Sequence, residues 1–235
     1  MRVFLPVFLV ACAFGQATDP NARIDAAALR YRSGDEAGAF GAFVALEKEF
    51  PDDVDVRAWL GYLHLRRGDG PKAVAYLEKI RTLRPNDLEV ATNLGNAYVA
   101  TGQGDRALAT FDAILALAPK SFDALYNKGA LLIARKEFRP AVAALTAAVA
   151  VRPEDAYARC NLGVAYEGLR QPEKAWPEHR KSSDLDPRVP TFARNAGLVA
   201  ARIGKGADAI PYLARAAALD PGDGAVALAL ADLKS

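Results

Sequence analysis

The chain is poor in the residue types that most often carry chemistry or crosslinks. Its 235 residues include two cysteines, two histidines and one methionine. Cys12 and Cys160 are too few for a disulfide framework. His64 and His179 fall in different parts of the chain, whereas a metal site needs clustered ligands. No nucleophile has a histidine and a carboxylate at motif spacing, so the sequence predicts no enzyme, no metal and no cofactor.

The chain also lacks an excess of one charge and a long hydrophobic run. Thirty basic residues stand against 28 acidic ones, for a net charge of +2. A nucleic-acid binder needs a basic stripe to neutralise phosphates, so this class is not expected. The apolar run at residues 3–10 is too short to span a bilayer. These absences leave a protein or peptide as the expected partner.

Residues 1–19 are predicted to be a signal peptide and a short linker. Arg2 precedes the apolar run, and small residues follow it, as in export signals. The segment Leu9-Val10-Ala11-Cys12 resembles a bacterial lipobox, in which the cysteine is lipidated. Gly15-Gln16-Ala17 or Ala11-Cys12-Ala13 would instead serve an ordinary signal peptidase, and a wrongly assigned start is the third alternative. We therefore expect an exported protein, either an outer-membrane or periplasm-facing lipoprotein held through Cys12 or a soluble periplasmic or secreted form.

Six of the 14 prolines recur at one interval of 34 residues. They are Pro51, Pro85, Pro119, Pro153, Pro187 and Pro221. A fixed period of this length indicates a repeat architecture. The period divides the chain into residues 20–53, 54–87, 88–121, 122–155, 156–189 and 190–223, followed by a last segment, 224–235. Each repeat reads as two amphipathic helices, and the last segment reads as one capping helix.

Small residues recur inside both helices of each repeat. Position eight, counted from the start of a repeat, is glycine in repeats two to six, although glycine inside a helix costs about 1 kcal/mol relative to alanine. Position twenty is alanine in all six repeats. We expect the glycine of the first helix to face the alanine of the second, so that the two helices pack closely. Gly34, Gly68, Gly102 and Gly204 are expected to turn the chain between paired helices.

The third repeat carries Leu94-Gly95-x-x-Tyr98, then Ala107-x-x-x-Phe111, then Pro119. This order and spacing resemble the signature of the tetratricopeptide repeat (TPR) family. The resemblance implies an all-α fold, a right-handed superhelical solenoid of six helix-turn-helix repeats with a C-terminal capping helix. It also implies a concave groove lined by the first helices, at positions two, five, six, nine, twelve and thirteen of each repeat.

Position six is asparagine in four consecutive repeats. The residues are Asn93, Asn127, Asn161 and Asn195. Asparagine is a mediocre helix former, costing roughly 0.7 kcal/mol against alanine, so the recurrence needs a reason. The column resembles the asparagine ladder of peptide-binding TPR proteins, in which the amides hydrogen-bond a peptide main chain. The alternative is that repeat duplication copied a residue that bonds only within its own helix pair.

Other groove positions hint at the partner. Acidic residues occupy position two in repeats two to four, namely Asp55, Glu89 and Asp123, which favours a partner segment whose basic part lies there. Tyr62, Tyr126 and Tyr157 offer amphipathic anchors, and Arg194 lies in repeat six. The alternative is a merely solvated charged face. The carboxylate clamp that binds chaperone tails uses lysines and an arginine in addition to asparagines. These basic residues are missing here, so Asn96 alone does not form such a clamp.

Irregular positions predict where the stack is weak. Lys128 in repeat four and His179 in repeat five replace apolar residues, so we expect incomplete burial at both. His179 and Ser182 together predict that repeat five is the loosest layer. Pro177 and Pro211 predict second helices that begin late or bend. Leu228, Leu230 and Leu233 are expected to cover repeat six.

Together these features predict a TPR protein-interaction scaffold in the bacterial cell envelope that binds an extended segment in its groove. The alternative is a structural assembly factor, resembling the pilotin-type lipoproteins, that is bound through its convex face. The sequence indicates no oligomeric state.

Overall fold

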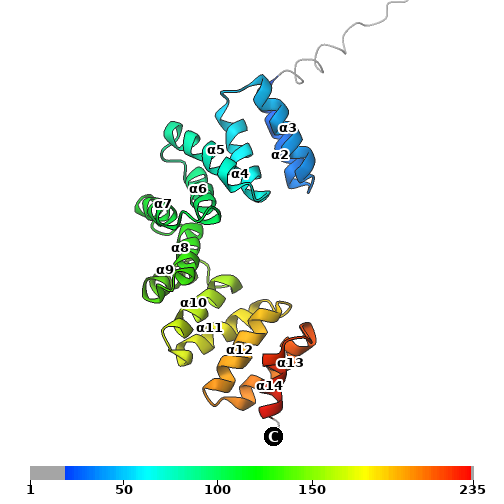
Figure 1. The fold of residues 1–235 in the computed structure, drawn as a ribbon, viewed down its shortest axis with the longest axis vertical. Coiled ribbons are helices and arrows are strands. Elements are labelled where there is room, and N and C mark those ends of the chain that lie inside the picture. Colours follow the sequence, from blue (N-terminus) through cyan, green and yellow to red (C-terminus); the bar gives the residue numbers. More distant parts are fainter. Residues whose placement is uncertain (1–18, 234–235) are drawn as a thin grey trace, which may run out of the picture. The chain divides into compact units, whose positions relative to one another are not determined.

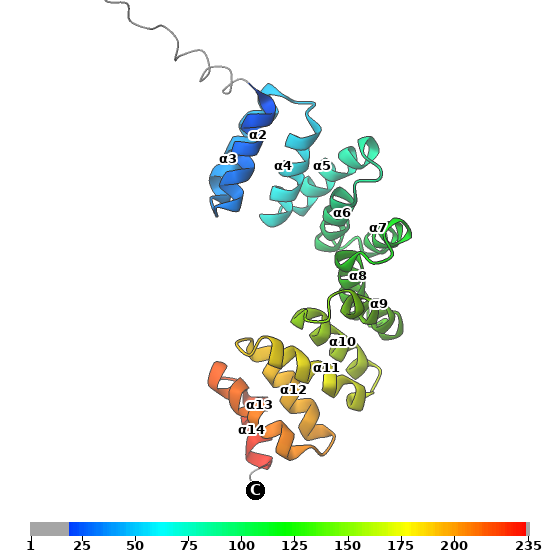
Figure 2. The same cartoon turned by 180° about the vertical axis from the view of Figure 1, so that it is seen from behind.

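A computed structural model describes residues 19–233. Across this range the chain forms thirteen α-helices and no strand (Figures 1 and 2). They form six pairs and a last helix: α2 (Pro20–Arg32) with α3 (Glu36–Glu49), α4 (Val54–Arg66) with α5 (Gly70–Leu83), α6 (Leu88–Ala100) with α7 (Gly104–Leu117), α8 (Phe122–Ala134) with α9 (Phe138–Val151), α10 (Ala156–Gly168) with α11 (Pro172–Leu185), α12 (Pro190–Arg202) with α13 (Gly206–Leu219), and α14 (Gly224–Asp232). The predicted all-α fold of six helix pairs and a capping helix is confirmed.

The described chain divides into two compact units, with the boundary inside α7 after Ala107. In unit 1, which ends at Ala107, each helix packs on its neighbour in sequence, and α4 also packs on α6. In unit 2, which begins at Leu108, the same order holds from α8 to α14, and α8 packs on α10. First helices therefore lie side by side within each unit, which is what brings residues of successive repeats together.

Aspartates begin several of the first helices. The Asp53 carboxylate accepts hydrogen bonds from the backbone N–H groups of Asp55 and Val56, each at 2.9 Å. Asp87 and Asp223 cap α6 and α14 in the same way. Such caps satisfy the N–H groups that a helix leaves unpaired at its start and contribute about 1 kcal/mol each.

The turn inside each helix pair requires a left-handed residue. Glycine fills this position in four pairs, with φ of 91°, 79°, 74° and 76° at Gly34, Gly68, Gly102 and Gly204. The pairs α8–α9 and α10–α11 use Lys136 and Arg170 instead, with φ of 61° and 57°. A side chain in this region of backbone space is strained, so these two turns carry a cost that the other four avoid.

The helix glycines leave room for a large side chain of the paired helix. A Cβ on Gly129 would lie 2.5 Å from Leu145 Cγ, and one on Gly197 would lie 2.5 Å from Leu213 Cγ. Gly61 stands in the same relation to Leu77 in unit 1. The expected close approach is therefore present, but the glycine faces position twenty-four rather than the position-twenty alanine. Those alanines are fully buried nonetheless.

Repeat five is not the loose layer that its polar residues predict. His179, Ser182 and Ser183 are all 0% exposed, so the expectation of incomplete burial at His179 is wrong. The Ser182 hydroxyl donates a 2.8 Å hydrogen bond to the Ala156 carbonyl oxygen, and His179 pairs with a carboxylate. These contacts satisfy Ser182 and His179 Nε2, whereas His179 Nδ1 and Ser183 Oγ are buried without a hydrogen-bond partner within residues 19–233. Lys128 is partly exposed, as expected, and pairs with Asp112.

The two internal prolines do not delay their helices. The helix α11 begins at Pro172 and α13 at Gly206, the same repeat position at which the other second helices begin. Pro177 and Pro211 lie inside these helices with exposed rings, so the predicted late start is wrong. Each proline removes one backbone donor near the start of its helix.

The C-terminal segment covers repeat six through two of the three predicted leucines and through Val226, which was not predicted. Val226 is fully buried against α12 and α13, and Leu230 and Leu233 pack partly against the same core. Leu228 is 65% exposed, so its predicted covering role is wrong.

Candidate functional site

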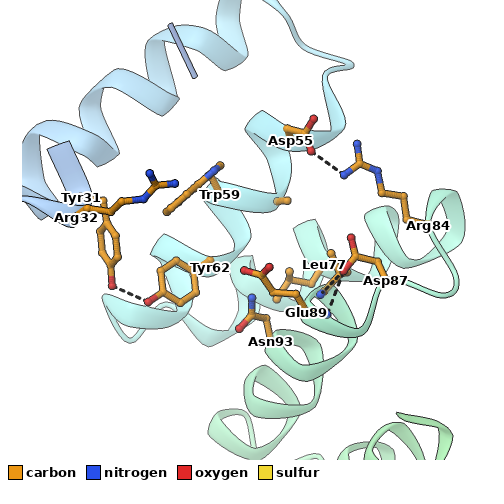
Figure 3. A pocket seen from close by; sticks show the side chains of 12 residues that line it. Tyr31, Arg32, Asp55, Trp59, Tyr62, Leu77, Arg84, Asp87, Glu89 and Asn93 are labelled. Carbon is orange, nitrogen blue, oxygen red and sulfur yellow. Dashed lines mark hydrogen bonds and ion pairs between the residues drawn. The ribbon is translucent and has the colours of Figure 1, made fainter. Parts of the chain in front are cut away.

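The first helices of repeats one to three line a pocket of about 520 Å³ in unit 1 (Figure 3). It lies among α2, α4 and α6, with the end of α5 closing one side. The lining residues are Tyr31, Arg32, Asp55, Ala58, Trp59, Tyr62, Leu77, Arg84, Asp87, Glu89, Val90 and Asn93. The pocket therefore combines aromatic, acidic, basic and amide side chains.

Three aromatic rings form one wall of the pocket. The ring centroids of Tyr31, Trp59 and Tyr62 lie between 5.5 and 6.0 Å apart, with edge-to-face geometry in every pair. Phe43, which is fully buried, stacks on Trp59 at 5.2 Å. Edge-to-face pairs at this separation are favourable. The rings are thus held in place by core packing rather than left to rotate freely.

A hydrogen bond joins the two tyrosines of this wall. The hydroxyl oxygens of Tyr31 and Tyr62 are 2.6 Å apart, as the dashed line in Figure 3 shows. Burial, followed by this hydrogen bond, raises the pKa of Tyr62 to about 12. The Tyr62 hydroxyl is therefore neutral at physiological pH and adds no charge to the wall.

The charged side chains of the pocket differ in their pairing. Asp55 accepts a 2.7 Å hydrogen bond from Arg84, and Asp87 caps α6. The exposed Glu89 carboxylate has no ion pair within residues 19–233, and Figure 3 shows it directed toward the ring of Tyr62. Glu89 is the carboxylate of this pocket that is left available to a partner.

Four of the residues predicted at groove positions line this pocket, namely Asp55, Tyr62, Glu89 and Asn93. Sequence reasoning did not single out Tyr31 and Trp59, although a signal was present. Trp59 occupies position six, where the following repeats hold asparagine, and Tyr31 occupies position twelve. Asn96, also on α6, is half-buried and lies outside the pocket lining.

In unit 2 the asparagine column touches the preceding repeat. Asn161 forms a side-chain hydrogen bond with Tyr126, and Asn195 Nδ2 lies 3.6 Å from Cys160 Sγ. In both cases the partner stands at position five of the preceding first helix. Asn127 and the other two are half-buried. The amides therefore help join successive repeats, which neither sequence alternative foresaw.

The remaining predicted groove residues of unit 2 are spread over several helices. Asp123, on α8, lies 3.9 Å from Arg152, and Arg194, on α12, forms a 2.7 Å ion pair with Asp223. Tyr157 is 56% exposed, with its ring edge-on to Phe192 at 5.1 Å. Tyr157 is the most accessible of the three predicted tyrosine anchors, since Tyr62 and Tyr126 are half-buried.

A second hollow, of about 380 Å³, lies between α10 and α12. It is lined by Glu167, Arg194, Asn195, Leu198, Val199 and Arg202. Behind it, His179 Nε2 lies 2.8 Å from Glu167 Oε1, and Arg202 pairs with the other oxygen. Burial acts to raise the pKa of Glu167, but hydrogen bonds from His179 and Arg202 outweigh it and leave that pKa below the ordinary value.

Family models identify the family to which the chain belongs. Two tetratricopeptide repeat models match, one over residues 65–132 and the other over residues 24–87, 131–178 and 180–232. The chain belongs to the TPR family. A search of curated proteins finds no match.

Solved structures of similar TPR chains include MamA from Desulfovibrio magneticus RS-1, which is 32% identical. That match has a TM-score of 0.66 and covers 74% of this chain and 98% of the MamA chain. MamA AMB-1 is 27% identical with a TM-score of 0.61, covering 73% and 94% of the two chains. MamA MSR-1 is also 27% identical, with a TM-score of 0.59 and coverage of 68% and 92%.

Membership of the TPR family makes this chain a protein-interaction scaffold, since TPR repeats generally bind proteins and do not catalyse reactions.

Within residues 19–233 no group of three histidine, cysteine or acidic residues is placed to hold a metal ion. Burial raises the pKa of the Cys160 thiol, which disfavours the reactive thiolate. No helix in the same range is long and apolar enough to cross a membrane. Cys12 lies outside the described residues.

Proposed function

We propose that this protein is an exported scaffold of the bacterial cell envelope that binds an extended partner segment along the first helices of its repeats. One observation carries the proposal. Of the twelve residues that line the unit 1 pocket, eight stand at the positions that the TPR resemblance assigns to the groove. They are Tyr31, Arg32, Asp55, Ala58, Trp59, Tyr62, Glu89 and Asn93. A hollow lined in this way suits a partner held by side chains of several repeats.

The asparagine column supports contact with a peptide main chain in unit 2. Each amide offers two N–H donors and one acceptor oxygen. Asn195 directs its amide nitrogen to Cys160, which occupies one donor and leaves the acceptor and the second donor. Tyr157, largely exposed on α10, adds an amphipathic ring beside this column. An amide can thus brace the stack and bind a partner at the same time.

The ion pairs of the acidic groove residues indicate where a basic part of the partner would bind. Asp55 pairs with Arg84, and Asp123 lies close to Arg152, so the attraction of these two acids for a partner is reduced. Glu89 has no ion pair within residues 19–233. The basic part of the partner is therefore expected over repeat three rather than evenly over repeats two to four.

The envelope location rests on the sequence of residues 1–19. An export signal ending in a lipobox would anchor the scaffold through a lipid on Cys12, whereas ordinary cleavage would release it. The alternative function, a pilotin-like assembly factor, uses the opposite face, formed by the second helices. Neither reading requires any catalytic group.

Site-specific photocrosslinking in cells distinguishes groove binding from convex-face binding. A benzoylphenylalanine at Tyr157 on α10 is compared with one at exposed Arg180 on α11. We expect the Tyr157 position to give partner adducts. Asn161→Ala should reduce their yield, because losing a hydrogen bond of the side-chain amide from an interface costs about 1–3 kcal/mol. Adducts from Arg180 alone would favour the convex-face alternative.

Metabolic labelling with a fatty-acid analogue tests the anchor. The wild-type chain is expected to incorporate label, and Cys12→Ser is expected to remove it. A wild-type chain without label would eliminate the lipoprotein form and leave soluble export. Cys160→Ser is the matched control, since its thiol is buried and should not change labelling.

A further inference from the structure

We propose that the unit 1 pocket binds one arginine side chain of the partner segment. The inference rests on the proposed groove binding and specifies its chemistry. It is carried by two features on facing sides of one hollow, the aromatic wall of Tyr31, Trp59 and Tyr62 and the available carboxylate of Glu89. Neither feature alone would indicate a cation.

The aromatic wall suits a planar cation. Ring faces carry negative electrostatic potential and attract guanidinium groups, with tryptophan the strongest partner. Trp59 is fixed from behind by Phe43, and the Tyr31–Tyr62 hydrogen bond fixes the other two rings. A site whose rings are already ordered loses little conformational freedom on binding. The chain itself uses the same contact elsewhere, since the Arg67 guanidinium lies 4.2 Å from the Phe40 ring centroid.

Glu89 supplies the opposite charge at the right place. Glu89 lies in the first turn of α6, and its carboxylate projects toward the side of the pocket that Tyr62 forms (Figure 3). Arginine presents a fork of N–H donors that matches a carboxylate while its flat face stacks on a ring, which lysine cannot do. Asn93, also in the lining, offers an amide acceptor to the donors that remain.

The charges around the pocket favour a cation only modestly. Three acidic side chains, Asp55, Asp87 and Glu89, stand against Arg32 and Arg84. Arg84 is held by Asp55, but Arg32 has no ion pair within residues 19–233 and lies near Trp59 in Figure 3. Arg32 therefore opposes the guest, so its removal should strengthen binding. An anionic guest would require the reverse.

The test is a titration of the full mature chain followed by the indole N–H signals of its two tryptophans. The probe is N-acetyl-arginine amide, and its uncharged analogue is N-acetyl-citrulline amide. We expect saturable movement of the Trp59 signal with a Kd on the order of 1 mM for so small a ligand. The citrulline probe should bind about tenfold more weakly, since it lacks the cation. Trp176, 5% exposed in unit 2, is the internal control and should not move.

Variants then assign the charges. Glu89→Gln should raise the Kd about fivefold, and Arg32→Gln should lower it about twofold. Asp123→Asn is the matched control. Asp123 stands at the same repeat position as Glu89 but lies in unit 2, so its variant should leave the Kd unchanged. Glu89 is exposed, so its amide variant is expected to fold, and the comparison of the two probes needs no variant at all.

Equal binding of the arginine and citrulline probes would overturn the proposal. So would tighter binding of N-acetyl-glutamate amide that Arg32→Gln abolishes, because the pocket would then hold an anion. Failure here with intact crosslinking from Tyr157 would remove only the arginine assignment. Failure of both would remove groove binding itself.

Discussion

His179 Nε2 lies 2.8 Å from Glu167 Oε1 in a layer where His179 is fully buried. Other repeats place phenylalanine or leucine at the His179 position, and a Cβ on Gly163 would lie 2.5 Å from the His179 ring. Glu167 in turn pairs with Arg202 of the next repeat. Repeats five and six are therefore joined by a chain of polar side chains that includes one fully buried histidine.

Stability in acid should depend on Glu167. Its folded-state pKa is lowered, because hydrogen bonds from His179 and Arg202 outweigh burial. A group of this kind contributes stability that is present above the unfolded pKa of about 4.3 and is lost as pH falls through the folded pKa. We expect Glu167→Gln to flatten the decline in unfolding free energy below about pH 5, measured by urea denaturation at several pH values.

Glu173→Gln is the control for that series. Glu173 is exposed at the start of α11 and forms no ion pair within residues 19–233. Its variant should keep the wild-type pH dependence. Identical pH profiles for wild type and Glu167→Gln would mean that the pairing contributes nothing to folding.

Alanine at a helix glycine should separate propensity from packing. Gly129→Ala gains about 1 kcal/mol of helix propensity, but its Cβ meets Leu145 Cγ at 2.5 Å. Overpacking of this kind typically costs about 1–3 kcal/mol, so a net loss is expected in thermal or urea unfolding. Gly41→Ala in α3 has nothing within 4 Å of the new Cβ and should stabilise by about 0.5–1 kcal/mol. Equal effects at the two sites would contradict the packing explanation.

The period of 34 residues was sufficient to predict the helices, because proline, aspartate and glycine each act locally. Burial at His179 could not be predicted in this way. It depends on a carboxylate from the preceding helix and an arginine from the next repeat, Glu167 and Arg202, and their meeting is a property of the packed stack. The exposure of Leu228 likewise depends on packing, whereas the starts of α11 and α13 keep the repeat position of the other second helices despite their prolines.

The candidate site was predictable only in part. Tyr62, Glu89 and Asn93 were predicted from repeat positions and do line one pocket. Tyr31 and Trp59 stand at groove positions too, but Trp59 replaces the asparagine of the later repeats, and Tyr31 stands at position twelve, where no residue type recurs. Their value comes from mutual ring contacts at 5.5–6.0 Å, which no single-repeat comparison reveals. The ion pair with Arg84 also changes the interpretation of Asp55, because it reduces the attraction of this carboxylate for a basic partner.

Replacing a left-handed lysine by glycine should stabilise unit 2. Lys136 has φ of 61° at the turn between α8 and α9. A side chain at this backbone conformation costs the folded state roughly 1–2 kcal/mol. Glycine removes that strain, but its greater freedom in the unfolded chain offsets about 0.5–1 kcal/mol of the gain. We expect Lys136→Gly to raise the unfolding free energy by about 0.5–1 kcal/mol. Gly102→Ala, the reverse change at φ of 74°, should lower it, and a destabilised Lys136→Gly would show that the lysine side chain matters more than its backbone.

The tyrosine pair of the aromatic wall should be visible in alkaline titration. Burial and then the Tyr31 hydrogen bond raise the pKa of Tyr62 to about 12, above the ordinary value near 10. The neutral phenol therefore stabilises the fold fully below about pH 10, and this contribution is lost as pH rises through about 12. Tyr31→Phe keeps the burial but removes the hydrogen bond, so it should move the Tyr62 pKa downward while leaving it above 10, as followed by the ring-carbon NMR signal of Tyr62.

Tyr76 provides the reference for this measurement. Burial and a hydrogen bond to Glu47 also raise its pKa to about 12, and Tyr76 does not line the pocket. Its titration should be the same in wild type and in Tyr31→Phe. A wild-type Tyr62 that ionises near pH 10 would mean that its ring is neither buried nor joined to the Tyr31 hydroxyl, and the ring would then be free to turn away from a guest. In that event the pocket would lose the ordered wall on which recognition of a guanidinium depends.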